Sequence, residues 1–417
     1  MNSRTAITTI CIVAAILRIL YVSIAKDLKS DYYWEYGEIG KNLVAGKGYS
    51  LWYFKNDVLE QRFDPAISAF PSAYMPPGYV MFLVPFILIP STITRNILLV
   101  SVQTGVSLFS IVLIWKFTRR FFSERSALIA AVLACVLPEF VFSVVSFTPT
   151  VLYHCGVLLF LLLLSRDHEL SKRSISIGLG LLASVLILLR PEFMVFLVMT
   201  IVVLLVCGER RRPILLLAAI LVSTAPWTAR NYHVFGELIP TTTSFGLNLY
   251  RGNNALPIGS WGDATIAAEI AHLTRNDKFE VSLDRMYSNH ALDYIKTHPG
   301  TVAIRWFQKI WDLWVLNLHD PTGRSMNTGL SVLSVLLFIA FLIGVVSSWS
   351  PSHHLYSYVF FVYFTLTAMV FFVMPRYQTM MQIIVLPFAA YGIEIVWNRI
   401  QPILSDSKKH GFEREPS

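Results

Sequence analysis

The segment "TAITTICIVAAILRILYVSIA", residues 5–25, decides the class of fold, because it is apolar over a membrane-spanning length and holds one charged side chain, Arg18. About 20 helical residues at 1.5 Å rise cross the ~30 Å hydrocarbon core of a bilayer. The 417-residue chain shares this character, with 55% hydrophobic and only 14% charged residues. The sequence therefore predicts an all-α polytopic membrane protein, in which Arg18 either pairs with an acid or extends toward the headgroups.

Further apolar stretches along the chain give about ten predicted transmembrane helices. They lie at about 5–25, 95–116, 126–146, 149–165, 174–190, 192–207, 213–229, 328–347, 355–374 and 378–397. The stretch "PPGYVMFLVPFILIP", 76–90, is short and has proline at both ends. We expect a helix that lies at the membrane interface there.

The basic residues fix the predicted orientation. With the N-terminus inside, most lysines and arginines near the membrane fall in cytoplasmic segments, namely 116–125, 165–173, 208–212 and the tail from Asn398. The positive-inside rule then places both termini in the cytoplasm. The net charge of +8 is explained by this topology and gives no support to nucleic-acid binding.

The predicted topology divides the chain into four parts. They are an N-terminal membrane module, 1–229, which includes a first outer loop at 26–94; a second outer loop at 230–327; C-terminal transmembrane helices at 328–397; and a cytoplasmic tail at 398–417. Within the second loop, residues 282–300 are expected to form a helix stopped by Pro299 and Gly300. Residues 301–316 carry three tryptophans and basic residues, a pattern typical of a second interfacial helix.

The first outer loop begins with "SDYYWEYGEIGKNLVAGKGYS", residues 30–50, which carries three acids. Asp31, Glu35, Glu38 and Asn42 are spaced at i, i+4, i+7 and i+11, which predicts one acidic stripe on a helix that ends at the following glycines. Such a stripe is usually a solvated face. Alternatively, one carboxylate is held against the apolar surface, where its raised pKa suits general-base catalysis near neutral pH.

In order along the chain, this stretch and its successors resemble the GT-C integral-membrane glycosyltransferases. The likeness is to the family-39-type enzymes related to protein O-mannosyltransferases and to the lipid A aminoarabinose transferase. It rests on the acidic helix with "NLVAGKGYS" (42–50), "PPGY" (76–79), "LLRPE" (188–192), "PWTARNYHVFG" (226–236), "NLYRGNN" (248–254), "HALDYIKTHPG" (290–300) and "PRYQ" (375–378). The resemblance implies a GT-C-like fold and transfer of a sugar from a polyprenyl-phosphate carrier to an acceptor on the outer face.

The resemblance also implies roles for particular residues. An acid in the first outer loop would activate the acceptor hydroxyl, and the family's spacing to Asn42 fits Asp31, with Glu35 one turn later as the rival. Glu38 is expected to be helical surface or a secondary contact. The family's second acid is absent here, and Glu139 is the nearest carboxylate. Relatives often carry a lysine where this chain has Met75.

Arginines are the expected phosphate ligands, because the planar guanidinium pairs with two phosphate oxygens and stays charged. Arg190 and Arg376 are favoured, since both lie at outer ends of predicted spans beside prolines. Pairing with Glu192 or with headgroups is the alternative. Arg251 is the third expected phosphate ligand, with Arg230 as a possible partner. Further substrate contacts are expected from Tyr74, Tyr79 and Asn253; the alternatives are interfacial anchoring by the two tyrosines and a simple turn at "GNN", 252–254.

The leading hypothesis is a polyprenyl-phosphate-sugar-dependent glycosyltransferase of the bacterial plasma membrane that decorates a cell-envelope glycan, lipid or protein. No cofactor or metal is demanded, because neither outer loop contains a "DxD" triplet, although a divalent metal is not excluded. The alternative is a flippase for a lipid-linked sugar, which would need internal repeats or paired broken spans.

Overall fold

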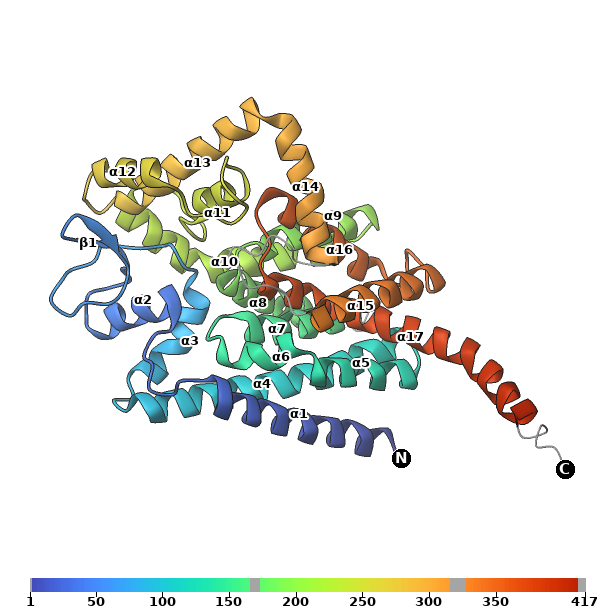
Figure 1. Ribbon diagram of the computed structural model, residues 1–417. Helices are drawn as coiled ribbons and strands as arrows, with labels where there is room; N and C mark the ends of the chain where they lie inside the picture. Colours follow the sequence, from blue (N-terminus) through green and yellow to red (C-terminus); the bar gives the residue numbers. More distant parts are fainter. Residues whose placement is uncertain (1, 166–172, 316–327, 412–417) are drawn as a thin grey trace.

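The computed structural model describes residues 2–165, 173–315 and 328–411 (Figure 1). Within these ranges a helix, or a pair of helices, coincides with every predicted span. These are α1 (Ser3–Ala25), α4 (Thr92–Phe121), α5 (Glu124–Val136) continued by α6 (Pro138–Phe142) and the short 3₁₀ helix η1 (Ser143–Val145), α7 (Thr150–Leu164), α8 (Arg173–Leu189), α9 (Phe193–Val206), α10 (Arg211–Phe235), α15 (Thr328–Ser347), α16 (Leu355–Val370) and α17 (Pro375–Gly411).

Not all of these helices are long enough to cross a membrane by themselves. In the described part of the chain, five are long and apolar enough: α1, α4, α10, α15 and α17. A sixth span arises if α5 and the α6–η1 segment, bent by 57° at Pro138, count as one. The helices α7, α8, α9 and α16 are apolar but shorter, so the count of ten spans stays a prediction.

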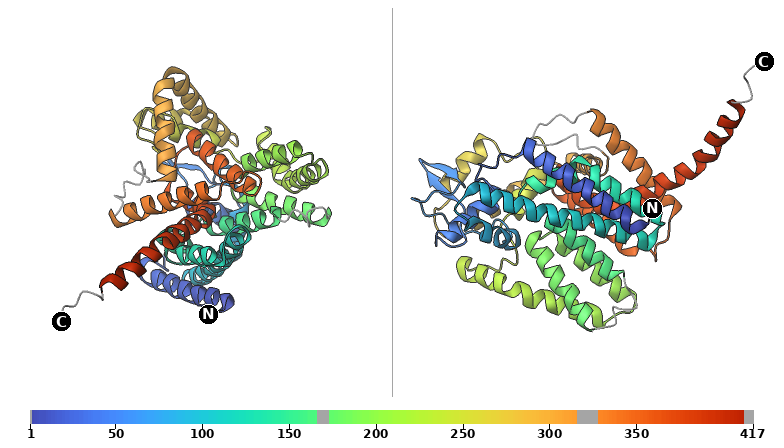
Figure 2. Two further views of the ribbon diagram at one scale, coloured as in Figure 1. Left: turned by 90° about the vertical axis from the view of Figure 1, so that its right-hand side faces the viewer. Right: turned by 90° about the horizontal axis from the view of Figure 1, so that it is seen from below.

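The helix bundle has two distinct ends. The start of α1 and the end of α17 lie at one end, and α2 and β1 lie at the other (Figures 1 and 2). This arrangement is compatible with both termini on one side of a membrane. Arg18 is fully buried in α1 and donates to the Ser107 hydroxyl at 3.0 Å and to the backbone carbonyls of Ala134 and Cys135, both at 3.4 Å. Arg18 therefore satisfies carbonyls at the end of α5, beside the bend, and neither pairs with an acid nor extends to headgroups.

The first outer loop folds as α2 (Trp34–Val44), a hairpin of β1 (Tyr53–Lys55) and β2 (Val58–Glu60), and α3 (Pro77–Ile87). The predicted start of the acidic helix is wrong, because α2 begins at Trp34, with φ 58°, and Asp31 precedes it. The predicted end is confirmed, since Gly46 and Gly48 both adopt φ 74°. The segment 76–90 is helical as expected, and its position at a membrane interface stays a prediction.

The second outer loop contains α11 (Phe245–Gly252), α12 (Ala264–His272), α13 (Phe279–Thr297) and α14 (Pro299–Trp314). Pro299 opens α14 instead of simply ending α13, which fits the preference for proline in the first helical turn. The side chains of Ile304, Phe307 and Trp311 on α14 are exposed, whereas Lys309 is buried. The basic side of this amphipathic helix therefore faces the protein.

The two outer loops share one core. The Phe70 ring of the first loop lies 5.0 Å from the Phe279 ring of the second. Beside this contact, the buried Glu280 carboxylate accepts hydrogen bonds from the Ser72 hydroxyl and the Ala73 N–H, each at 2.6 Å, and from the Thr243 hydroxyl. Glu280 therefore links α13 by hydrogen bonds to the segment that precedes "PPGY".

Glu280 makes the stability of this junction depend on pH. Burial raises its pKa from 4.5 to about 7, although the hydrogen bonds from Ser72, Thr243 and Ala73 oppose the shift. A raised carboxyl pKa gives a stabilisation that is complete below pH 4.5 and is lost as the pH rises through about 7. We expect the free energy of unfolding to fall by about 3 kcal/mol over this window.

This expectation is tested by thermal unfolding of detergent-solubilised protein at about pH 5 and about pH 8. Glu280→Gln should remove most of the difference between the two midpoints, because an amide does not ionise. Glu269→Gln is the matched control, since Glu269 is an exposed acid on α12 that pairs with His290. An unchanged pH dependence in Glu280→Gln would assign the effect to another group.

Candidate active site

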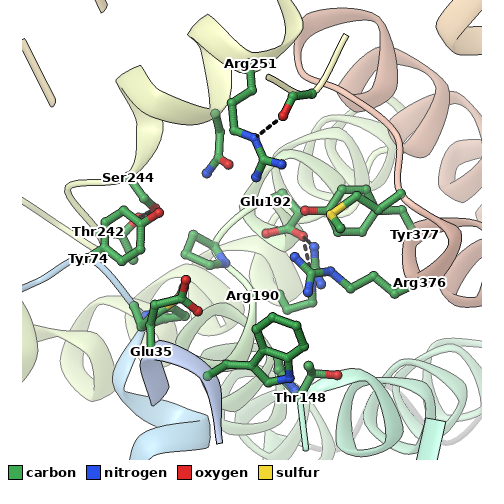
Figure 3. Close-up of a pocket in the computed structure, with 18 of the residues that line it drawn as sticks. Glu35, Tyr74, Thr148, Arg190, Glu192, Thr242, Ser244, Arg251, Arg376 and Tyr377 are labelled. Atoms are coloured by element: carbon green, nitrogen blue, oxygen red, sulfur yellow. Dashed lines mark hydrogen bonds and ion pairs between the residues drawn. The ribbon is translucent and has the colours of Figure 1, made fainter. Parts of the chain in front are cut away.

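A cavity of about 770 Å³ opens where the two outer loops meet the ends of the membrane helices. Five of the eleven candidate residues from the sequence line it: Glu35, Tyr74, Arg190, Arg251 and Arg376. They come from α2, the segment just before "PPGY", the α8–α9 junction, α11 and the start of α17. Figure 3 shows Glu35 across the cavity from Arg376, with Arg251 on a third wall.

Glu35 is the carboxylate that the fold brings into this cavity from the acidic stretch. It lies in the first turn of α2, where the helix dipole favours a negative charge, and it is only 9% exposed. Burial raises its pKa, while its own backbone N–H and the charges of Arg376 and Arg251 oppose the rise. A carboxylate with a raised pKa is suited to remove a proton near neutral pH.

Arg190 and Arg376 lie together on the wall opposite Glu35. Arg190 forms an ion pair with Glu192, and its guanidinium lies 4.9 Å from the Tyr377 ring centre. The Arg376 guanidinium lies 5.4 Å from the same ring, and its Nε has no hydrogen-bond partner among the described residues. Arg190 therefore shares its charge with Glu192, whereas Arg376 has no acid partner among the described residues and contacts Tyr377.

Arg251, in the last turn of α11, is held in place from several sides. Its Nε donates to the Gly259 carbonyl at 2.9 Å, and its guanidinium lies between the rings of Trp261 (4.2 Å) and Phe372 (4.1 Å). The remaining guanidinium nitrogens face the cavity side of the helix (Figure 3). The arrangement fixes one charged fork in position before a ligand arrives.

The charges that line the cavity do not balance. Four arginines (Arg190, Arg251, Arg305 and Arg376) stand against two glutamates (Glu35 and Glu192), which leaves a formal surplus of two positive charges (4 − 2). A concave site with surplus guanidinium groups favours an anion with several oxygens, such as a phosphate. The site thus combines one buried carboxylate with a cationic clamp.

Two acids of the stretch 30–50 lie outside this cavity. Asp31 has a side chain that is 49% exposed, and it pairs with Lys41 at 3.4 Å and Arg62 at 3.7 Å. Glu38 is fully buried and pairs with Lys41 at 3.0 Å, and it accepts the Phe63 N–H at 2.5 Å. The expectation that Glu38 is helical surface is therefore wrong, and the first choice of Asp31 over Glu35 loses its geometric basis.

Four more candidates do not line the cavity: Tyr79, Glu139, Arg230 and Asn253. The Tyr79 hydroxyl donates to the Gln103 side chain at 3.0 Å. Arg230 donates to two backbone carbonyls of the first loop, at 2.6 and 2.9 Å. The Asn253 side chain donates to the backbone carbonyls of Leu249, at 2.9 Å, and Val370, at 2.8 Å. Glu139 lies at the bend of the α5–α6 pair. In this structure, Tyr79, Arg230 and Asn253 therefore hold neighbouring segments together and do not line the cavity.

Several lining residues were missing from the sequence-based set. Glu192 and Tyr377 lie within "LLRPE" and "PRYQ", so the motifs themselves carried the signal. Trp34, Thr148 and Trp261 also line the cavity, and no motif marks their role. Trp34 is held by its indole N–H, which donates to the Ser146 carbonyl at 2.9 Å.

The fold and this cavity define a helical membrane protein with a carboxylate-and-arginine site formed under outer loops. Consistent with that class, residues 74–229 match the family model of dolichyl-phosphate-mannose-protein mannosyltransferases. The match contains the "PPGY" and "LLRPE" motifs and the first four residues of "PWTARNYHVFG". No curated protein is found that matches the chain in sequence.

The fold is shared with a solved oligosaccharyltransferase. The apo oligosaccharyltransferase of Archaeoglobus fulgidus aligns over 100% of this chain and 52% of its own, at 11% identity and a TM-score of 0.54. The same enzyme tethered to an acceptor peptide aligns over 96% and 50%, at 13% identity and a TM-score of 0.57. ArnT of Cupriavidus metallidurans, bound to undecaprenyl phosphate, aligns over 95% and 79%, at 14% identity and a TM-score of 0.41.

These findings confirm the resemblance to GT-C glycosyltransferases. The chain spans about half the length of the oligosaccharyltransferases that it matches. At identities of only 11–13%, the structural likeness shows the fold alone, so the chemistry has to be argued from the residues of this chain. Among those that the structure describes, no group of three or more His, Cys, Asp or Glu residues is placed to hold a metal ion.

Proposed function

We propose that the protein transfers a sugar from a polyprenyl-phosphate carrier to a hydroxyl-bearing cell-envelope acceptor: a glycan, a lipid or a protein. The observation that carries the proposal is the placement of Glu35 opposite Arg376 and Arg251 across one cavity with surplus positive charge. An inverting transfer needs these two parts on opposite faces of the sugar, a base on one side and an anion clamp on the other.

An apolar cavity beside the main one supports a lipid-borne donor. It has a volume of about 310 Å³ and shares Arg190, Glu192 and Tyr377 with the main cavity. Its other walls include apolar side chains from α11, α14 and α16 and the loop after α16: Phe245, Leu313, Phe364, Ala368, Phe371 and Phe372. Isoprene units next to a phosphate would be accommodated here while the phosphate stays at the arginines. A solved structure of the Archaeoglobus fulgidus oligosaccharyltransferase AglB, which shares the fold, contains dolichol phosphate.

The proposed reaction is a single displacement. The Glu35 carboxylate takes the proton of the acceptor hydroxyl as its oxygen forms a bond to the anomeric carbon. The bond between that carbon and the phosphate oxygen breaks, and its electron pair stays on the phosphate. Arg376 and Arg251 stabilise the negative charge that develops there.

The proposed setting is the bacterial plasma membrane, with both termini in the cytoplasm and the cavity on the outer face. The basic segments at the far end of the bundle support this orientation. The acceptor then lies in the envelope, where a lipid-linked sugar is the available donor. A flippase for the same lipid is the alternative, and it uses the same arginines without needing a base.

The test uses purified protein in liposomes with a radiolabelled polyprenyl-phosphate sugar and a crude envelope fraction as acceptor. Transfer should release polyprenyl phosphate and move the label to the acceptor. Movement of intact labelled lipid between leaflets, without cleavage of the sugar–phosphate bond, would instead establish the flippase.

A further inference from the structure

A second polar cavity, which the proposed transfer does not use, lies at the opposite end of the bundle. It has a volume of about 280 Å³ and is lined by the last turns of α4 and α7 and by the start of α16. The opposite ends of α7 and α16 adjoin the main cavity. Thr148 and Pro149, just before α7, and Met374, after α16, line that cavity. The second cavity is therefore separated from the first by the length of the membrane helices.

The walls of this cavity carry hydrogen-bond donors and positive charge. Arg120 lines it, and its Nε and Nη2 both donate to the Ser165 carbonyl, which orients the guanidinium. His353, Ser352 and Ser357 line it as well. The described residues that line it include no acid.

His354 adds a buried polar group to this wall. Its side chain is 3% exposed and stacks on Phe122, with 5.4 Å between ring centres. Its Nδ1 has no hydrogen-bond partner in the described part of the chain. Burial, with His353 nearby, lowers the His354 pKa to about 4, so without a ligand the ring is neutral at physiological pH.

The start of α16 contributes backbone donors to the same place. His354 is the N-cap residue of this 16-residue helix and makes no side-chain cap hydrogen bond. The first N–H groups of a helix lack partners within the helix, and the helix dipole adds a partial positive charge there. Helix N-termini of this kind bind phosphate and sulfate oxygens, most strongly beside an arginine.

We propose that this second cavity binds a phosphate-bearing anion, at the end of the bundle opposite the candidate active site. Arg120 supplies the charged fork, the start of α16 supplies backbone N–H groups, and Ser357 and His354 complete the wall. A phospholipid headgroup and a soluble phosphate ester offer the same chemistry. The proposal does not depend on sugar transfer at the main cavity.

The test maps bound phosphate on the full-length protein in nanodiscs. A photoactivatable phosphatidic acid and, separately, photoactivatable phenyl phosphate are titrated, and the crosslinked peptides are identified by mass spectrometry. At least one probe should label the segments 117–121 and 352–357. Labelling by the lipid alone identifies a headgroup, and labelling by phenyl phosphate identifies a soluble ester. An absence of labelling by both probes at these segments overturns the proposal.

Variants separate this cavity from the arginines of the main one. Arg120→Gln should weaken labelling at these segments by about tenfold, because a charge-assisted hydrogen bond is lost. Ser352→Asp, an exposed position, should have a similar effect by repulsion without disturbing a described contact. Arg125→Gln is the matched control, since Arg125 is exposed on the same end and contacts Asn398 instead. Wild-type labelling in both Arg120→Gln and Ser352→Asp would contradict the proposal.

Discussion

Glu35→Gln is expected to lower the turnover number for sugar transfer by about 10²–10⁴-fold, the usual contribution of a positioned general base. The amide is nearly the same size and cannot accept the proton of the acceptor hydroxyl. Asp31→Asn is expected to leave the rate within about twofold, because Asp31 lies outside the cavity and is paired with Lys41 and Arg62 at an exposed site. Both variants are assayed at saturating donor, so that the turnover number is compared directly.

The pH dependence of transfer provides a second measurement on Glu35. Because burial raises its pKa, the active carboxylate form is lost at a higher pH than for an ordinary glutamate. The rate of the wild type should therefore fall as the pH is lowered toward this raised pKa, whereas the residual rate of Glu35→Gln should lack that limb. A full rate in Glu35→Gln would exclude Glu35 as the base, and a large loss in Asp31→Asn alone would assign the base to Asp31.

The choice between Asp31 and Glu35 shows which part of the site could not be predicted from the sequence. The spacing of the acids predicted a helix correctly from Trp34 onward, because helical periodicity is a local property. Its start depended on distant contacts. The Asn96 side chain on α4 donates to the Leu28 and Ser30 carbonyls, each at 2.8 Å, and accepts from the Tyr33 hydroxyl at 2.8 Å. These bonds keep the segment before Trp34 out of the helix, and no local pattern encodes them.

The arginines illustrate the opposite case. Arg190 and Arg376 stood out because charged residues at the outer ends of apolar spans are costly and run against the positive-inside bias. Both line the cavity. By contrast, the clamp around Arg251 depends on Trp261 and Phe372, which lie in different loops of the chain. Hydropathy predicts where the apolar helices lie. The position of the second outer loop over them depends on side-chain packing, which hydropathy does not predict.

The structural role of Arg230, which bonds backbone carbonyls of the first outer loop, could not be predicted from the sequence either. Its motif, "PWTARNYHVFG", gave the same signal as those of Arg190 and Arg376, namely an arginine after an apolar run. In the fold, α10 extends to Phe235, so Arg230 lies within a helix and reaches the carbonyls of Ser72 and Tyr49. A motif can locate an arginine near the end of an apolar helix, whereas the partner of that arginine is decided by how far the helix continues.

Arg376→Gln is expected to reduce the catalytic efficiency, kcat/KM, by about 10²–10³-fold, comparable with the loss of one preorganised donor to a developing anion. Arg376 lines the cavity and has no acid partner among the described residues, while Arg190 is paired with Glu192. Arg376→Lys should recover only part of the rate, since an ammonium keeps the charge and loses the planar fork. Arg285→Gln is the control, because Arg285 lies exposed on α13, where it pairs with Glu237.

If Arg376 stabilises the departing phosphate, and does not merely support the fold, Arg376→Gln should change two measured constants by different amounts. The donor is a phosphodiester with one negative charge, whereas the released polyprenyl phosphate is a monoester that carries more charge at neutral pH. Loss of one guanidinium should therefore weaken inhibition by added polyprenyl phosphate more than it raises the KM for the donor, by about tenfold against about threefold. Equal changes in both constants would mean that Arg376 only attracts the lipid, and the stabilisation of the leaving group would then have to come from Arg251.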